Sequence, residues 1–102
     1  MSNSQDPMFS IMRSLWDRVT PDLRGVAFSL VDSVLEVRLL YADSPDAATV
    51  AMVSEAETEC VADFWSSWEV NYRAEHVPVD RPRTLHEDER WVFLRHEPAA
   101  SA

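Results

Sequence analysis

A helical period in the apolar positions marks the beginning of the chain. Between residues 8 and 19, apolar side chains recur three and four positions apart, which places them on one face of a helix. Asp6 is a suitable N-cap residue, and Pro7 fits the first helical position, where its missing N–H costs nothing. Thr20-Pro21 ends the helix. The apolar face comprises Met8, Ile11, Met12, Leu15 and Val19.

The other positions of this helix divide into an apolar flank and a polar side. Phe9 and Trp16 lie at the flank, and Trp16 fits a place in the core, as does Trp91 near the end of the chain. Arg13 and Asp17 are an i,i+4 pair of opposite charge. We therefore expect an amphipathic helix whose apolar face packs on the core. The polar side comprises Ser10, Arg13, Ser14 and Asp17.

Alternation with a period of two predicts a hairpin after this helix. In residues 34–41 apolar side chains alternate with charged ones, a pattern typical of a half-buried strand. Residues 25–31 form its partner strand. Asp32-Ser33 is the connecting two-residue turn, although it lacks the glycine that is preferred there.

A second helix follows the hairpin. Ser44 and Pro45 supply its cap and its first position, and it runs to about Phe64 or Trp65. Cys60 lies on its apolar stripe, so we expect this cysteine to pack as a small hydrophobic residue. The stripe comprises Val50, Val53, Cys60, Val61 and Phe64.

Two further strands complete the predicted fold. Residues 68–79 and 90–96 alternate like strands and flank a charge-dense loop. The order helix, hairpin, helix, hairpin predicts a two-layer α+β domain, in which two helices cover a mainly antiparallel four-stranded sheet. The 102 residues suit a single domain, residues 1–98, with residues 99–102 as a frayed tail.

The composition excludes several kinds of chemistry. Gly25 is the only glycine, which excludes the glycine-rich phosphate cradles. A single cysteine excludes a disulfide framework and a cysteine-based zinc cluster. His76, His86 and His96 lie ten residues apart, without the spacing of a helical metal site. We expect no catalytic residue, no metal ion and no cofactor.

The charge balance restricts the partners. Eighteen acidic residues face nine arginines and no lysine, which gives a formal charge of −9. Such a surface repels phosphate backbones and anionic membranes, so we expect neither direct nucleic-acid binding nor membrane binding. No signal peptide and no apolar run long enough to span a bilayer is visible, so we expect a cytoplasmic location.

Most of the excess charge lies in one segment. Between Leu39 and Tyr72 there are seven acidic residues and no basic one. Glu55, Glu59 and Asp63 are spaced i, i+4 and i+8, so they stack on one side of the second helix, and nothing in that helix offsets their repulsion. This acidic ridge (Glu55, Glu59 and Asp63) is either a surface for a basic partner or a solvated face.

Three other residues of this segment attract attention. Trp65 and Trp68 bracket the end of the second helix, where they either anchor an interface or close the edge of the core. Glu57 projects from the apolar stripe, where a carboxylate needs a partner or stays protonated. It either pairs with a sheet arginine such as Arg24 or Arg38, or lines a pocket with a raised pKa.

Several short segments, taken together, resemble a known kind of protein. They are Val-Thr-Pro-Asp-Leu-Arg-Gly-Val at residues 19–26, Val-Ser-Glu-Ala-Glu-Thr-Glu at residues 53–59 with Ala-Asp-Phe at residues 62–64, and Trp-Val-Phe-Leu-Arg at residues 91–95. The chain resembles small bacterial immunity proteins of the contact-dependent growth inhibition (CdiI-like) type. That resemblance implies a protein without catalytic activity that binds and neutralises one cognate toxin domain, often a nuclease.

These observations lead to one principal hypothesis and two alternatives. The principal one is an immunity protein, monomeric or weakly dimeric when free, that neutralises a basic toxin through its acidic region. The first alternative is a small structural or homo-oligomeric module whose acidity maintains solubility. The second is an enzyme that uses Glu57 or a histidine. The expected partner-binding residues are Asp43, Asp46, Glu55, Glu59, Asp63, Trp65, Trp68 and Glu69.

Overall fold

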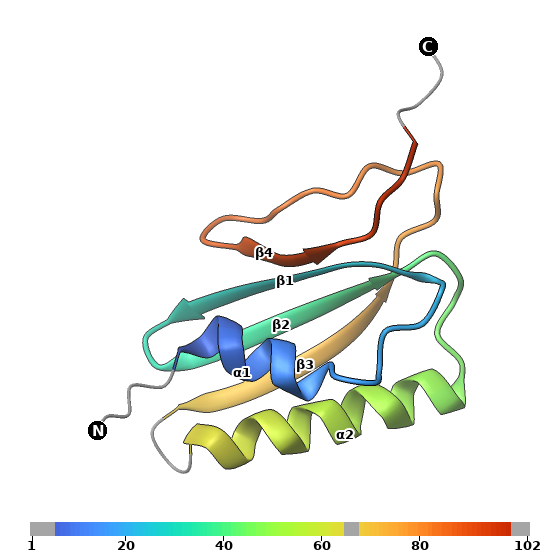
Figure 1. Ribbon diagram of the computed structural model, residues 1–102. Coiled ribbons are helices and arrows are strands. Elements are labelled where there is room, and N and C mark those ends of the chain that lie inside the picture. Colours follow the sequence, from blue (N-terminus) through green and yellow to red (C-terminus); the bar gives the residue numbers. More distant parts are fainter. Residues whose placement is uncertain (1–5, 65–67, 99–102) are drawn as a thin grey trace.

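The computed structural model describes residues 6–64 and 68–98 and shows two helices on one four-stranded sheet (Figure 1). Strand order across the sheet is β3-β2-β1-β4. The mixed α+β class is therefore confirmed. The elements are α1 (Pro7–Ser14), β1 (Leu23–Val31), β2 (Val34–Tyr41), α2 (Ala47–Phe64), β3 (Glu69–His76) and β4 (Arg90–Leu94).

The first hairpin forms as the alternation predicts. β1 and β2 pair antiparallel, with Val31 opposite Val34 across the turn. Asp32 and Ser33 both adopt positive φ, 52° and 65°, the left-handed pair that a tight hairpin requires even without glycine. The ladder also has a register shift between Leu23 and Gly25, at the opposite end from this strained turn.

The second hairpin does not exist, so the prediction of a mainly antiparallel sheet was wrong. β3 pairs with β2 in parallel, and β4 pairs antiparallel with β1 at the opposite edge. The physical reason is that α2 carries the chain back along the sheet, so β3 starts at the same end as β2. The chain then crosses to the free edge of β1, where β4 completes a mixed sheet.

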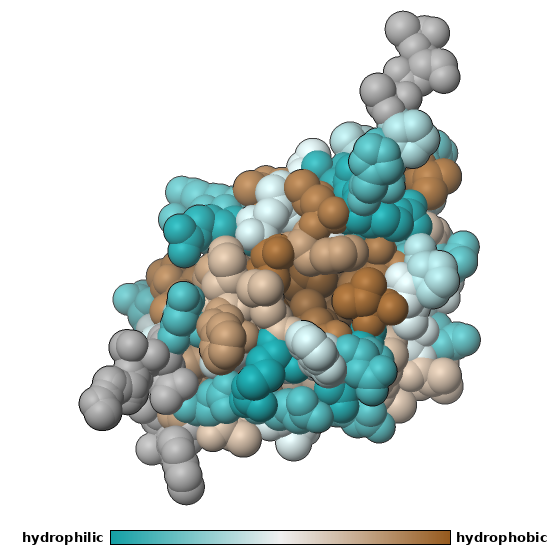
Figure 2. Space-filling model, viewed as in Figure 1, coloured by the Kyte–Doolittle hydropathy of each residue, from teal (hydrophilic) through white to brown (hydrophobic). Residues whose placement is uncertain are grey.

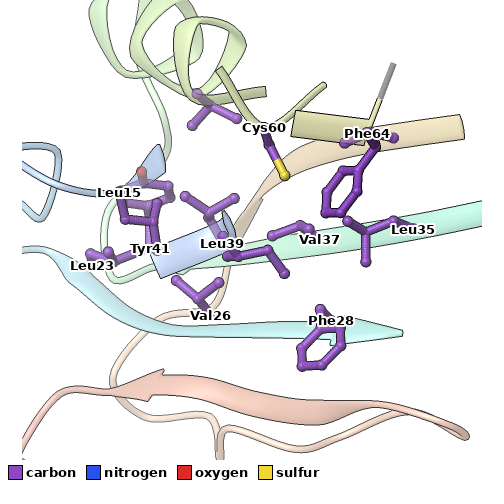
Figure 3. Packing of buried hydrophobic residues seen from close by; sticks show 13 residues of the cluster. Leu15, Leu23, Val26, Phe28, Leu35, Val37, Leu39, Tyr41, Cys60 and Phe64 are labelled. Atoms are coloured by element: carbon purple, nitrogen blue, oxygen red, sulfur yellow. The ribbon is translucent and has the colours of Figure 1, made fainter. Parts of the chain in front are cut away.

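The hydrophobic core lies between the helices and one face of the sheet (Figure 3). α1 contributes Ile11 and Leu15, and α2 contributes Val53, Cys60 and Phe64. Cys60 is a free thiol buried in this core, which confirms that it packs as a hydrophobic residue. The sheet side of this core comprises Leu23, Val26, Phe28, Leu35, Val37, Leu39, Tyr41 and Val70.

The other face of the sheet is covered by the connection between β3 and β4. Arg24 and Arg38 point to this face from β1 and β2, and both are buried. Arg24 donates to the backbone carbonyls of Val77, Pro78 and Arg81, at 2.8–3.0 Å. Arg38 likewise donates to the Thr84 carbonyl, at 2.9 Å, so both arginines tie this loop to the sheet.

Several element boundaries differ from the predicted ones. α1 ends at Ser14 rather than near Val19, and Asp17 then adopts a positive φ of 76°. α2 begins at Ala47, because Asp46 rather than Ser44 accepts a hydrogen bond from the Thr49 N–H, at 2.8 Å. The last two strands are shorter than predicted. Within the described ranges, no helix is both long and apolar enough to cross a membrane.

Candidate functional site

α1 lies on the core with its serines inward. Ser10 and Ser14 are 2% and 1% exposed, so the prediction that they face the solvent was wrong. The Ser14 hydroxyl donates to the Ile11 carbonyl at 2.7 Å and lies 2.6 Å from the Tyr72 hydroxyl of β3. Small side chains here let α1 approach its neighbours closely, and the hydroxyl contacts satisfy the buried polar groups.

Several large apolar side chains of α1 and of the segment that follows it face outward, whereas Ile11 and Leu15 are buried in the core. Three residues that were expected in the core are exposed: Met12, Val19 and Trp16, of which Trp16 is 81% exposed. Phe9, on the same side of α1, is exposed as well. Sequence reasoning missed this surface, although Phe9, Met12 and Trp16 stand three and four residues apart and form a second apolar stripe.

A groove lies between the end of α1 and β4. Its volume is about 300 Å³, and its walls are apolar apart from Asp17. Figure 2 shows hydrophobic residues gathered in the middle of the face that α1 and β4 present. We call this depression the α1–β4 groove. It is lined by Met12, Leu15, Trp16, Asp17, Val19, Val92 and Phe93.

The acidic ridge on α2 runs beside α1, and two arginines of that region pair with it. Arg18 Nη2 lies 2.9 Å from Glu59 and 3.7 Å from Glu55, and Arg13 pairs with Asp63. The ridge is therefore partly neutralised across the helix interface, which the sequence of α2 alone does not reveal. Although burial acts in the opposite direction, the Arg13 hydrogen bond keeps the pKa of Asp63 below its ordinary value.

The remaining predicted partner residues fall into two groups at opposite ends of α2. Asp43 is exposed before the helix, and Asp46 caps it. Trp68 and Glu69 follow its other end, about 27 Å away at 1.5 Å per residue. Trp68 is half-buried and packs on Phe64, with ring centroids 4.4 Å apart. Trp65 lies outside the described residues.

Glu57 has a structural partner that neither interpretation foresaw. Its Oε2 accepts a hydrogen bond from the Tyr72 backbone N–H, at 2.8 Å, on the free edge of β3. Arg24 pairs with Glu97, and Arg38 pairs with Glu75 and Glu89, so neither forms the ion pair with Glu57 that was one of the two interpretations. Glu57 does line a hollow of about 360 Å³ between α2 and β3. A carboxylate at this place blunts the exposed edge of the sheet. Within residues 6–64 and 68–98, no cluster of side chains suits a metal ion.

An exposed apolar groove beside a ridge of ion pairs is typical of a domain that binds another protein. Comparison with known families agrees with that class. The family model described as MafI2 immunity protein matches residues 4–97, and this chain therefore belongs to the MafI2 immunity protein family. No curated protein matches the sequence.

The family match refines the resemblance seen in the sequence. It supports a bacterial immunity protein that acts against a toxin partner. The family it names is MafI2, which serves a different toxin system from the CdiI-like proteins that the short segments resemble. The broad identification from sequence is thus confirmed, whereas the contact-dependent growth inhibition type is not.

Proposed function

We propose that this protein neutralises its toxin by direct, non-catalytic binding, and that the toxin is a basic domain, a nuclease acting in the cytoplasm. The observation that carries the proposal is the formal charge of −9 in a member of an immunity family. A nuclease needs a basic cleft for its phosphate substrate, so an acidic inhibitor is attracted to it over a distance. Charge attraction of this kind raises the association rate.

The acidic region of α2 and its flanks is the proposed contact for the basic toxin. Within the acidic ridge, Glu55 is the most exposed carboxylate: its side chain is 66% exposed, against 46% for Glu59 and 21% for Asp63, and it lies 3.7 Å from Arg18. Exposed ion pairs of this kind contribute about 0–1 kcal/mol, so a toxin lysine or arginine can take the place of Arg18. Trp65 and Trp68 complete the proposed region with the acids Asp43, Asp46, Glu55, Glu59, Asp63 and Glu69.

Co-expression tests the binding itself. The chain is produced with the C-terminal toxin domain encoded beside its gene, and growth and co-purification are measured. We expect rescue of growth and a complex that survives purification. A toxic domain that is neither bound nor neutralised by this chain would refute the proposal.

A matched pair of charge reversals tests the acidic contact. We expect Glu55→Lys to weaken toxin binding about tenfold or more at low salt, with a smaller effect at high salt, because screening reduces the lost attraction. The control is Glu87→Lys, which makes the same charge change on the loop between β3 and β4. Equal binding by both variants would remove Glu55 from the interface.

A further inference from the structure

The orientation of α1 exposes an apolar surface of a kind that a helix in a globular domain normally buries. Its two serines occupy the inward positions, while Trp16 and Met12 face the solvent. The inward side is fixed by the Ser14 contact to the Tyr72 hydroxyl of β3 and by the burial of Ile11 and Leu15, so the helix cannot rotate without losing that contact and core packing. A contiguous apolar surface held open in this way is typical of an interaction site.

Trp16 stands between two apolar hollows. One is the α1–β4 groove, of about 300 Å³, and the other is a depression of about 250 Å³ bordered by Phe9, Met12, Arg13 and Trp16. Both are at or below the small end of the volumes usual for ligand pockets, and each can hold one large side chain. An exposed tryptophan with a hollow on either side has the geometry of an interface anchor.

Charged groups border this apolar surface on both sides. Arg13 borders the second hollow and pairs with Asp63 of the acidic ridge, so the ridge adjoins the apolar surface around Trp16. On the groove side, Asp17 is exposed and lines the wall, and among the described residues it forms no ion pair. Its positive φ of 76° fixes the backbone that presents it.

These charges select the kind of occupant. A second copy of this chain would bring another formal charge of −9 to the same face. A basic partner would instead place a cation on Asp17 or on the ridge carboxylates as its apolar side chain entered the groove. Charge complementarity therefore favours a basic protein over a second copy.

We infer that the α1–β4 groove is the centre of the toxin interface, where Trp16 packs against an apolar toxin side chain flanked by lysine or arginine, and that the acidic ridge forms the rim. The inference rests on the proposed function, and it adds the surface and the chemistry of contact. An apolar centre inside a charged rim is the usual anatomy of a protein interface. In such an arrangement the central aromatic residue contributes most of the affinity.

The test is a titration of the purified toxin domain, the one encoded beside this gene, with the wild-type chain and three variants. We expect Trp16→Ala to weaken binding at least 30-fold, and Asp17→Asn to weaken it less and to reduce the salt dependence. The control is Val79→Ala, which removes a comparably exposed apolar side chain, 68% exposed, from the opposite loop and should change binding less than twofold. Thermal unfolding of each variant shows that the fold is intact.

The outcomes separate this inference from the proposed function. If the wild-type chain binds and neutralises the toxin while Trp16→Ala binds within threefold of it, the groove is not the interface, although the proposed function stands. If the wild-type chain does not bind, both are overturned. A dimer of the free chain that depends on Trp16 and persists when toxin is added would assign the groove to a second copy and overturn the inference.

Discussion

Replacing Glu97 with glutamine tests how the end of the chain is tied to the sheet. The Glu97 carboxylate accepts hydrogen bonds from Arg24 Nε and Nη2, both at 2.9 Å, and it also pairs with Arg83 and Arg95. Arg24 is buried and in turn holds the loop after β3. One carboxylate thus neutralises the arginine that fastens this loop to the sheet.

The loss of stability expected for Glu97→Gln follows from the pKa of the Glu97 carboxyl. Its hydrogen bonds with Arg24, aided by Arg95 and Arg83, lower the pKa of Glu97 from 4.5 to about 2. A depression of that size corresponds to about 3 kcal/mol of folding free energy when the group is ionised. Because glutamine keeps only part of the hydrogen bonding and none of the charge, we expect Glu97→Gln to lower the free energy of unfolding by about 2–3 kcal/mol at pH 7.

The contribution of Glu97 to the free energy of unfolding decreases as the pH falls. The folded pKa lies below the unfolded one, so the contribution is complete above about pH 5 and disappears as the pH falls through 4.5 toward 2. At pH 3 the difference between wild type and Glu97→Gln should have shrunk to about half or less. Urea unfolding followed by tryptophan fluorescence at pH 7 and pH 3 measures both values. A difference below about 0.5 kcal/mol at pH 7, or one that does not change with pH, would refute the reasoning.

Two further predictions concern the buried arginine of β2 and the first hairpin. Arg38 is 5% exposed and pairs with Glu89, whose side chain is nearly buried. We expect Arg38→Met to lower the free energy of unfolding by about 3–5 kcal/mol, because it leaves that carboxylate without a partner. The control, Arg73→Met at an exposed position of β3, should change the free energy of unfolding by less than about 0.5 kcal/mol. Equal unfolding midpoints of the two variants in urea would contradict this. We expect Ser33→Gly to raise the free energy of unfolding by about 0.5–1 kcal/mol, because glycine adopts the φ of 65° without strain. The control, Ser29→Gly inside β1, should lower the free energy of unfolding. A loss of stability in Ser33→Gly, measured by thermal unfolding, would show that the turn carries no such strain.

Local patterns determined most of the elements. The strand at residues 34–41 and the cap Asp6 depend on neighbours within a few positions, and both predictions were confirmed. The expectation that this strand is half-buried was wrong, because Arg38 and Leu40 are buried on its second face. The helical period of α2 correctly predicted the burial of Cys60, whereas Val50 and Val61, assigned to the same stripe, are exposed. The family was also accessible from short segments, although only at the level of a bacterial immunity protein.

The tertiary structure decided the features that depend on distant pairing. Arg13 pairs with Asp63, fifty positions away, rather than with Asp17, four positions away, because α1 ends before Asp17 and packs against α2. The acidic ridge is therefore relieved by residues outside its own segment. A count of charges along α2 cannot contain that information.

The sequence by itself predicted that a helix begins at Pro7 with Asp6 as its cap, and that it has an apolar face and a polar side containing two serines. Only the tertiary structure decided which of these faces the core. The serines turn inward because Tyr72 offers a hydroxyl partner and because small side chains allow close packing, and the outer stripe is left in solvent. Likewise, β3 joins β2 in parallel because α2 returns the chain to the end of the sheet where β2 begins. Long-range packing determines this pairing, which the alternation within β3 does not specify.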